Sequence, residues 1–273
     1  MIKGGWFLTL VSHRNRLPIL AWVMAFCWVL SGCAGLQPVP GKKVISPEAE
    51  KLFGRLSSQT APPTHLKGFG KYRLKSSEGK FSGRMAWAIV QPDLFRAEIL
   101  DITGRPFITL ANDGKWLYVH LKTENQFYKK SSTQATFKRV IGAPVTVKDI
   151  IAFLSGRIPI HAYQTAQVRP GGDGPGEAAG PILVLKAKWN RMVEEIHFDK
   201  DTLSPRKVVF YGGSGAFSYQ VDIGEPFDWR GYSFFRDLSF QNRHGNGLNI
   251  SLDRLWPDVE LSPSIFKLLN PYP

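Results

Sequence analysis

Cysteine, methionine and long apolar segments are all scarce in this sequence of 273 residues. There are two cysteines and four methionines, and the main uncharged apolar run covers about 11 residues, Ile19 to Val29. A helix needs roughly 20 apolar residues to cross a bilayer, which excludes a protein with several membrane-spanning helices. A hydrophobic fraction of 43% with 21% charged residues is ordinary for globular proteins and excludes a chain that is disordered throughout.

The apolar run has the layout of a secretory signal. Lys3, Arg14 and Arg16 precede it, and Leu30-Ser31-Gly32-Cys33 follows it. This tetrapeptide resembles the bacterial lipobox, in which signal peptidase cuts before the cysteine and the sulfur takes a diacylglycerol. We therefore expect residues 1–32 to be a signal peptide and Cys33 to be acylated, with membrane lipid as its partner. The alternatives are a chance tetrapeptide and an uncleaved anchor.

Cleavage before Cys33 would leave the mature chain without a free thiol, because Cys27 is lost with the leader. Disulfides, thiol catalysis and cysteine-ligated zinc are then excluded together. Residues 33–45 hold two prolines and two glycines without hydrophobic periodicity and predict a tether. Ala34 follows the cysteine in place of Asp, which resembles sorting to the outer membrane. We expect a lipid-anchored protein that faces the periplasm.

The sequence also lacks the common motifs of catalysis and of nucleotide or metal binding. The glycine-rich stretch 171–180 has no following Lys-Ser/Thr, and Ser214 misses the spacing of a nucleophile elbow. Glu195 and His197 share a strand face from which Glu194 points away, and a polar strand face is the expected role. No metal-binding spacing is formed by the histidines of the mature chain, His65, His120, His161, His197 and His244. We expect no catalytic residues, metal, cofactor or enzymatic activity.

Positive charge is plentiful, with 35 Lys and Arg against 22 Asp and Glu. This excess allows nucleic acid, an anionic membrane or an acidic ligand as partner. The basic residues form no compact stripe along the sequence, and an exported lipoprotein meets no nucleic acid. We therefore expect no nucleic-acid binding and favour an anionic envelope surface.

From residue 66 onward the pattern alternates with period two and is broken by short turns. It predicts strands at 66–75, 80–90, 94–101, 106–111, 115–121, 126–130, 181–188, 192–199, 206–211, 216–223, 231–241 and 247–254. Short helices are predicted after Ser46-Pro47, over 132–141, after the capping box Thr146 to Asp149, and after Ser262. The fold class is mainly β, an incomplete antiparallel barrel of about eleven strands in one domain, residues 46–273, with a few helices over the concave face.

Several apolar side chains recur at every second position of the first strands. Same-face sets are Met85, Trp87 and Ile89, then Phe95 and Ile99, then Trp116 and Tyr118. We expect these seven to line the concave face. The few short helices leave much of such a face uncovered, so a ligand-sized apolar cavity is predicted there. The alternative is an ordinary core beneath the helices.

One segment resembles a known family. It runs Phe95-Arg-Ala-Glu-Ile-Leu-Asp-Ile-Thr-Gly-Arg-Pro-Phe-Ile-Thr-Leu110 and continues as Asn112-Asp-Gly-Lys-Trp116. With the lipidated cysteine and a meander interrupted midway by helices, it is similar to the LolA/LolB family of lipoprotein carriers. The resemblance implies a half-barrel closed by helices over a cavity for acyl chains. It also implies a protruding loop at Ile102, Thr103 and Gly104, although Thr103 stands where the family's outer-membrane receptor has a leucine.

The function expected from the sequence is binding of acyl chains of lipoproteins or lipids, in the manner of a LolB-like receptor supplied by a periplasmic carrier. The alternative is a structural or scaffolding lipoprotein with a filled core and a protein partner. Ile102 separates two further possibilities, since an exposed Ile102 would contact membrane or cargo, whereas an inward one would be core.

Overall fold

The computed structural model describes residues 43–57, 61–133, 135–137, 145–172 and 180–272. The chain divides into two compact units, 1–42 and 43–273, and all of the described residues belong to the second. The expected signal peptide, Cys33 and most of the tether lie outside the described residues. Within the described part, no helix is long and apolar enough to cross a membrane.

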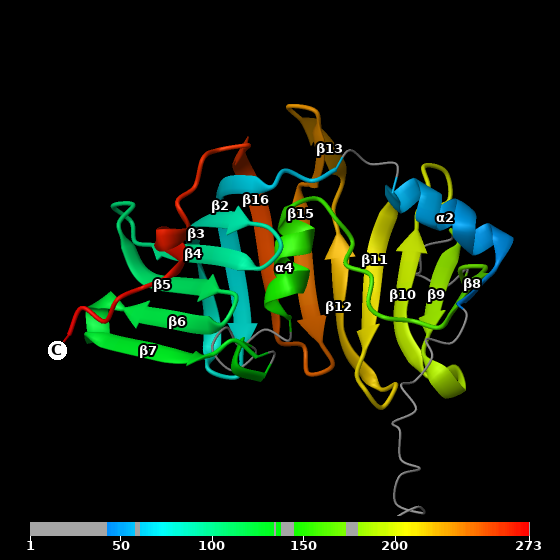
Figure 1. Cartoon of the computed structure of the whole chain (residues 1–273), viewed down its shortest axis with the longest axis horizontal. Coiled ribbons are helices and arrows are strands. Elements are labelled where there is room, and N and C mark those ends of the chain that lie inside the picture. The colour runs from blue at the N-terminus through cyan, green and yellow to red at the C-terminus, as the bar shows by residue number, and fades with distance from the viewer. Residues whose placement is uncertain (1–42, 58–60, 134, 138–144, 173–179, 273) are drawn as a thin grey trace, which may run out of the picture. The chain divides into compact units, whose positions relative to one another are not determined.

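The main element of the second unit is one open sheet of fourteen strands (Figure 1). Neighbouring strands are antiparallel throughout, except for the parallel pair of β1 and β8. In spatial order the strands are β1 (Val44–Ile45), β8 (Thr165–Arg169), β9 (Ile182–Lys186), β10 (Met192–Phe198), β11 (Pro205–Tyr211), β12 (Phe217–Ile223), β15 (Asp237–Asn242), β16 (Gly247–Pro257), β2 (His65–Ser76), β3 (Gly79–Val90), β4 (Leu94–Leu100), β5 (Pro106–Asp113), β6 (Trp116–Leu121) and β7 (Gln126–Ser131). The mainly β, incomplete-barrel prediction is confirmed, with fourteen strands in the sheet instead of about eleven.

Turn chemistry explains why the predicted hairpins form. Between β5 and β6, the Asp113 carboxylate accepts hydrogen bonds from the backbone N–H groups of Lys115 and Trp116 at 3.0 and 2.6 Å. Gly114 takes a φ of +87°, which residues with a side chain disfavour. The Asn-Asp-Gly signal therefore marks a genuine hairpin.

Three short strands, β1, β8 and β13 (Pro226–Trp229), lie outside the predicted strands, and one predicted strand is divided in two. Val44 and Ile45, expected to belong to the tether, pair with Thr165 and Ala166 as β1 and β8. The predicted strand 231–241 is two strands, β14 (Tyr232–Phe235) and β15, and β14 forms a separate hairpin with β13. The turn of that hairpin has positive φ at Arg230 and Gly231.

The helices begin at the predicted caps. α2 (Pro47–Ser57) starts after Ser46, whose hydroxyl accepts a hydrogen bond from Ala49 N–H at 3.2 Å. α4 (Val147–Leu154) starts after Thr146 in the same way. Of the helix predicted over 132–141, only residues 135–137 are described as helical, and residues 138–141 lie outside the described part. Three 3-10 turns complete the described elements, η2 (Lys122–Glu124), η3 (Lys188–Asn190) and η4 (Pro263–Phe266).

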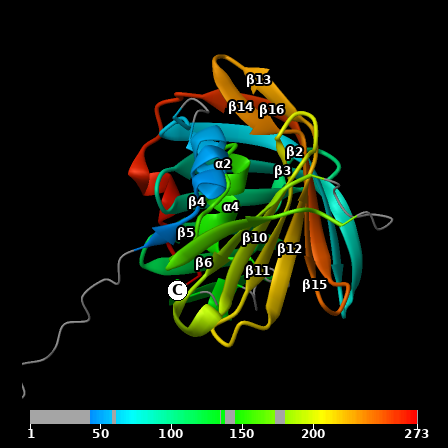
Figure 2. The same ribbon diagram turned by 90° about the vertical axis from the view of Figure 1, so that its right-hand side faces the viewer.

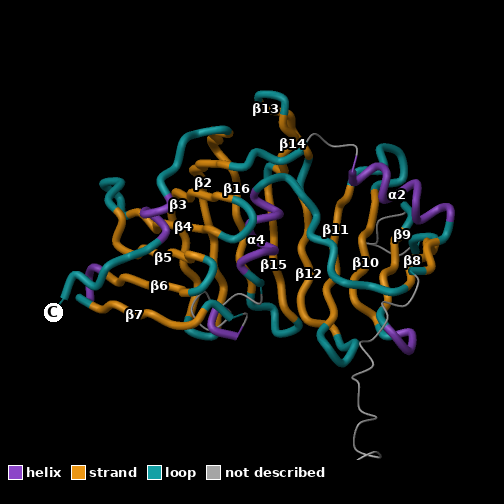
Figure 3. Tube along the Cα trace, in the orientation of Figure 1, coloured by secondary structure: helices purple, strands orange, loops and turns teal. Residues whose placement is uncertain are grey.

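The sheet is strongly curved and has distinct inner and outer faces (Figures 2 and 3). Figure 2 shows α2 and α4 on the concave, inner side. One continuous apolar cluster joins the inner side chains of both halves of the sheet to these helices. A smaller cluster on the outer side joins Ala88 to Leu261 and Phe266 of the C-terminal segment.

Candidate functional site

The inner face of β3 and β4 holds five of the seven predicted cavity residues. Met85 lies opposite Ile99, and Ile89 lies opposite Phe95, so residues on both strands share one face. Trp87 sits between them on the same face, and all except Ile99 are nearly fully buried. The structure therefore brings these five side chains together on the concave side.

Trp116 and Tyr118 lie on the outer face, so placing them with the other five was wrong. Tyr118 is opposite Ala111, and Ala111 is opposite Arg96, which alternates with the inward-facing Phe95. The Tyr118 hydroxyl donates a hydrogen bond to Asp113 at 2.7 Å. β6 has apolar side chains on both of its faces. The register of the hairpin with β5 directs Leu117 and Val119 inward, and therefore Trp116 and Tyr118 outward.

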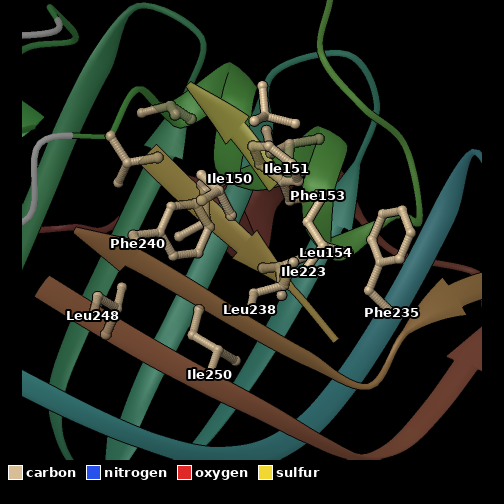
Figure 4. Packing of buried hydrophobic residues seen from close by; sticks show 14 of the residues in the cluster. Ile150, Ile151, Phe153, Leu154, Ile223, Phe235, Leu238, Phe240, Leu248 and Ile250 are labelled. Atoms are coloured by element: carbon tan, nitrogen blue, oxygen red, sulfur yellow. The ribbon is translucent and has the colours of Figure 1, made fainter. Parts of the chain in front are cut away.

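In the described part of the chain, the inner face is covered by packed side chains. Figure 4 shows Ile150, Phe153 and Leu154 of α4 against the side chains of the central strands. The Phe153 ring meets the ring of Phe240 nearly edge-on, with centroids 5.6 Å apart. The interior therefore resembles a closed core beneath α4, and the expected open cavity is not seen there.

A polar cluster joins α4 to the sheet inside this apolar interior. The hydroxyl of Tyr219 on β12 donates to Asp149 Oδ2 at 2.6 Å, and His161 Nε2 lies 3.0 Å from Asp149 Oδ1. Burial acts to raise the pKa of Asp149, but the hydrogen bonds from His161 and Tyr219 outweigh it and lower that pKa. The hydrogen bond to Asp149 raises the pKa of His161. Asp149 thus fixes α4 over the inner face as a charged, paired group.

Glu194 on β10 is a fully buried carboxyl group beside this cluster. Its Oε2 accepts a hydrogen bond from the backbone N–H of His161 at 3.1 Å. Its Oε1 is buried and has no hydrogen-bond partner among the described residues. Burial raises the pKa of Glu194 to about 8, so the group is mostly neutral at pH 7.

This cluster is only partly evident from local patterns. Glu194 is predicted to face away from Glu195 and His197, and it does, on the same side as Ile196. A glutamate that shares a strand face with apolar residues is a signal for burial. Asp149 is predicted as part of a capping box, and its N–H does bond to Thr146 at 3.0 Å, but its carboxylate reaches distant partners.

Glu195 lies on the outer face of β10, where it is largely buried among polar partners. Arg169 lies 2.9 Å from it, the Tyr211 hydroxyl donates to it at 3.0 Å, and His197 is 3.8 Å away. His197, Arg169 and Tyr211 together lower the pKa of Glu195 to about 2. Across the described residues, no group of three or more His, Cys, Asp or Glu side chains is arranged to hold a metal ion.

The loop between β4 and β5 projects from the sheet. Ile102 is 95% exposed, so of the two possibilities raised for it, the exposed one is confirmed. The Asp101 carboxylate holds the loop by accepting hydrogen bonds from the hydroxyl and N–H of Thr103 at 2.7 and 2.8 Å. Gly104 has a φ of +86° and open space around it. The apolar tip is thus presented by a defined turn.

Comparison with solved structures identifies the architecture. A LolA superfamily protein from Nitrosomonas europaea superposes with a TM-score of 0.51 at 12% identity, covering 81% of this chain and 97% of that one. A DUF1329 family protein from Desulfovibrio piger gives a TM-score of 0.52 at 13% identity, covering 80% and 95%. The chain has a LolA-like fold. No family model and no curated protein matches the sequence.

At 12–13% identity the likeness describes the fold alone. The candidate site is therefore defined by this chain's own residues, namely the apolar inner face, α4 above it and the Asp149 cluster that fixes α4.

Proposed function

We propose that the mature protein is an outer-membrane lipoprotein, anchored through acylated Cys33 and facing the periplasm, that binds acyl chains on the inner face of its sheet. The chains would belong to lipoproteins or other lipids, delivered in a LolB-like manner by a periplasmic carrier. Binding would need no covalent chemistry. The observation that supports this most is the continuous apolar inner face of a LolA-like fold, with the eight-residue α4 lying against it.

An acyl chain must take the place of side chains that now fill the interior. Ile150, Phe153 and Leu154 bury their apolar groups against the sheet, and a chain that replaced them would make equivalent contacts. Each CH₂ group removed from water contributes about 0.8 kcal/mol. α4 is held by its own apolar packing and by the hydrogen bonds of Asp149. Displacement of α4 is therefore the opening step.

Hydrogen exchange tests this step directly. The purified full chain carrying Cys33→Ser, so that no acyl group of its own competes, is mixed with a fluorescent fatty acid. We expect saturable fluorescence and several-fold faster amide exchange in residues 147–154 when the fatty acid is bound, because α4 leaves the inner face. No fluorescence change, with α4 equally protected in both samples, would contradict the proposal.

A matched pair of tyrosine variants examines the role of Asp149. Tyr219→Phe removes the hydroxyl that bonds to Asp149, and Tyr211→Phe removes a comparable hydroxyl on the outer face. A hydrogen bond to a charged group contributes roughly 1.5–3 kcal/mol. Weakening the closed state should therefore tighten fatty-acid binding about tenfold or more in Tyr219→Phe. Tyr211→Phe should bind like the wild type, and equal behaviour of the two variants would contradict this role.

A scaffolding lipoprotein is the second candidate, favoured by the packed interior beneath α4. It predicts that the interior stays closed and that fatty acid does not bind. The anchor is tested separately by fractionation of cells that express Cys33→Ser. We expect release from the outer membrane, since lipid provides the stable attachment. Retention there would show that lipid is not the main anchor.

A further inference from the structure

The outer face of β2 and β3 concentrates positive charge. Residues 65–90 contain six lysines or arginines and a single acidic residue, Glu78. The strand register places all six cations on the outer face: Lys67, Lys71, Arg73, Lys75, Lys80 and Arg84. Lys71 lies directly opposite Arg84, although like charges in opposed positions destabilise a sheet. The clustered cations lower the stability of the sheet, and an anionic ligand bound among them would offset this cost.

Three of these cations surround a hollow of about 330 Å³. Lys71, Arg73 and Arg84 are long, whereas the neighbouring Ser82 and Ser251 are short and leave space between them. Among the ion pairs between described residues, none involves these three cations. Guanidinium, ammonium and hydroxyl donors together match the oxygens of a phosphate group.

A second, mainly apolar hollow of about 550 Å³ lies further along the same face. The small side chains of Ala86 and Ala88 form its floor, and Phe69, Trp256 and Ile265 stand around it. The volume falls within the range typical of small-molecule sites.

Three charged residues line this hollow, namely Lys67, Arg96 and Glu98. Glu98 lines it and is paired with Arg96, whose guanidinium lies 2.6 Å from the carboxylate. Arg96 also donates to the backbone carbonyl of Ile265 at 2.7 Å, which fixes the C-terminal segment across the outer face. The hollow is therefore shaped by defined contacts and carries one net positive charge, that of Lys67.

The two hollows lie over successive outward-facing residue pairs of β2 and β3. Phe69 is opposite Ala86 at the apolar hollow, and the next outward-facing pair is Lys71 and Arg84 at the basic one. Two residues along a strand span about 7 Å, the distance from a headgroup phosphate to the start of its chain. We propose that this outer face binds a phosphate-bearing amphiphile, with its phosphate on Lys71, Arg73 and Arg84 and its apolar chain over Ala86 and Ala88. This site is separate from the inner face.

Calorimetric titration of the Cys33→Ser chain distinguishes the parts of the ligand. The probes are lysophosphatidylglycerol and lysophosphatidylcholine, both below their micellar concentrations, and inorganic phosphate. We expect lysophosphatidylglycerol to bind at least tenfold more tightly than either of the others, since it alone joins net negative charge to a chain. Equal affinity for inorganic phosphate would indicate a phosphate site without an apolar part and overturn the proposal. Equal affinity for lysophosphatidylcholine would overturn the role of the cations.

Variants separate this site from diffuse charge and from the inner face. Arg84→Ser should weaken lysophosphatidylglycerol binding about tenfold, whereas Lys75→Ser, which removes an equal charge from the same face outside the hollow, should change it little. Equal losses in the two would overturn a defined site. Ala86→Leu should fill the apolar hollow and weaken both lipids. If it unfolds, Trp256→Ala, at a 40% exposed position, serves instead, and unchanged binding there would contradict the proposal.

Discussion

Glu194 should make the stability of this protein fall as the pH rises through neutrality. Its side chain is fully buried, and burial raises its pKa to about 8 from an ordinary 4.5. The folded protein therefore holds a proton between these pH values that the unfolded chain releases. The stability that a group with a raised pKa contributes is fully present below its pKa in the unfolded chain. It is lost progressively as the pH rises to its pKa in the folded protein. The slope is up to about 1.4 kcal/mol per pH unit, or on the order of 5 kcal/mol across the window.

The neighbouring groups do not reverse this direction. The raised pKa of His161 adds a loss of stability as the pH rises above 6.5. The pKa of Asp149 is lowered from 3.8, so its contribution is lost only in acid, below the window. Both effects leave a net decrease in the free energy of unfolding between pH 5 and 8.

Urea unfolding of three proteins at several pH values measures the effect. In Glu194→Gln the slope between pH 5 and 8 should flatten to the weaker dependence left by His161. Glu195→Gln is the control, because the pKa of Glu195 is already about 2 in the folded state and its contribution changes only at lower pH. A wild-type slope retained in Glu194→Gln, or wild-type stability that rises across the window, would refute this role of Glu194.

Substitutions at three other positions have defined outcomes. Gly70→Ala would place a methyl group 2.2 Å from the backbone oxygen of Ser251. Urea unfolding should therefore show a loss of roughly 1–3 kcal/mol in the free energy of unfolding. An unchanged midpoint would show that β2 and β16 move apart there without cost. Thr146→Ala removes the cap of α4 and should cost about 1 kcal/mol, whereas Thr146→Ser should restore most of it. Ile102→Glu should change the free energy of unfolding by less than about 0.5 kcal/mol, since the side chain is 95% exposed, and a larger loss would reveal packing.

Local chemistry makes most of the architecture predictable. Alternating apolar residues and turns such as Asp113-Gly114 determine strands and hairpins from neighbours in the sequence, and Ser46 and Thr146 mark helix starts. β8 escapes prediction because its five residues alternate only two apolar side chains, Ala166 and Val168, and β1 because it is two residues long.

The candidate site is less predictable because it depends on distant contacts. Trp116 and Leu117 are both apolar, so only the register of the neighbouring hairpin decides which one faces inward. The bond between Asp149 and Tyr219 joins residues 70 positions apart, and no local pattern indicates it. Filling of the interior likewise depends on how α4 packs, which the periodicity of its sequence does not specify.

An open barrel retains two strand edges, and each can recruit another chain into its ladder. At one edge, β7 presents Lys129 and Lys130, whose charges oppose such recruitment. The opposite edge, β8, is covered by Val44 and Ile45, the part of the folded unit nearest Cys33 in the sequence. In the proposed lipoprotein, the residues that lead to the lipid would therefore also close a polymerisation-prone edge of the sheet. One short segment would then serve both attachment to the membrane and protection against aggregation.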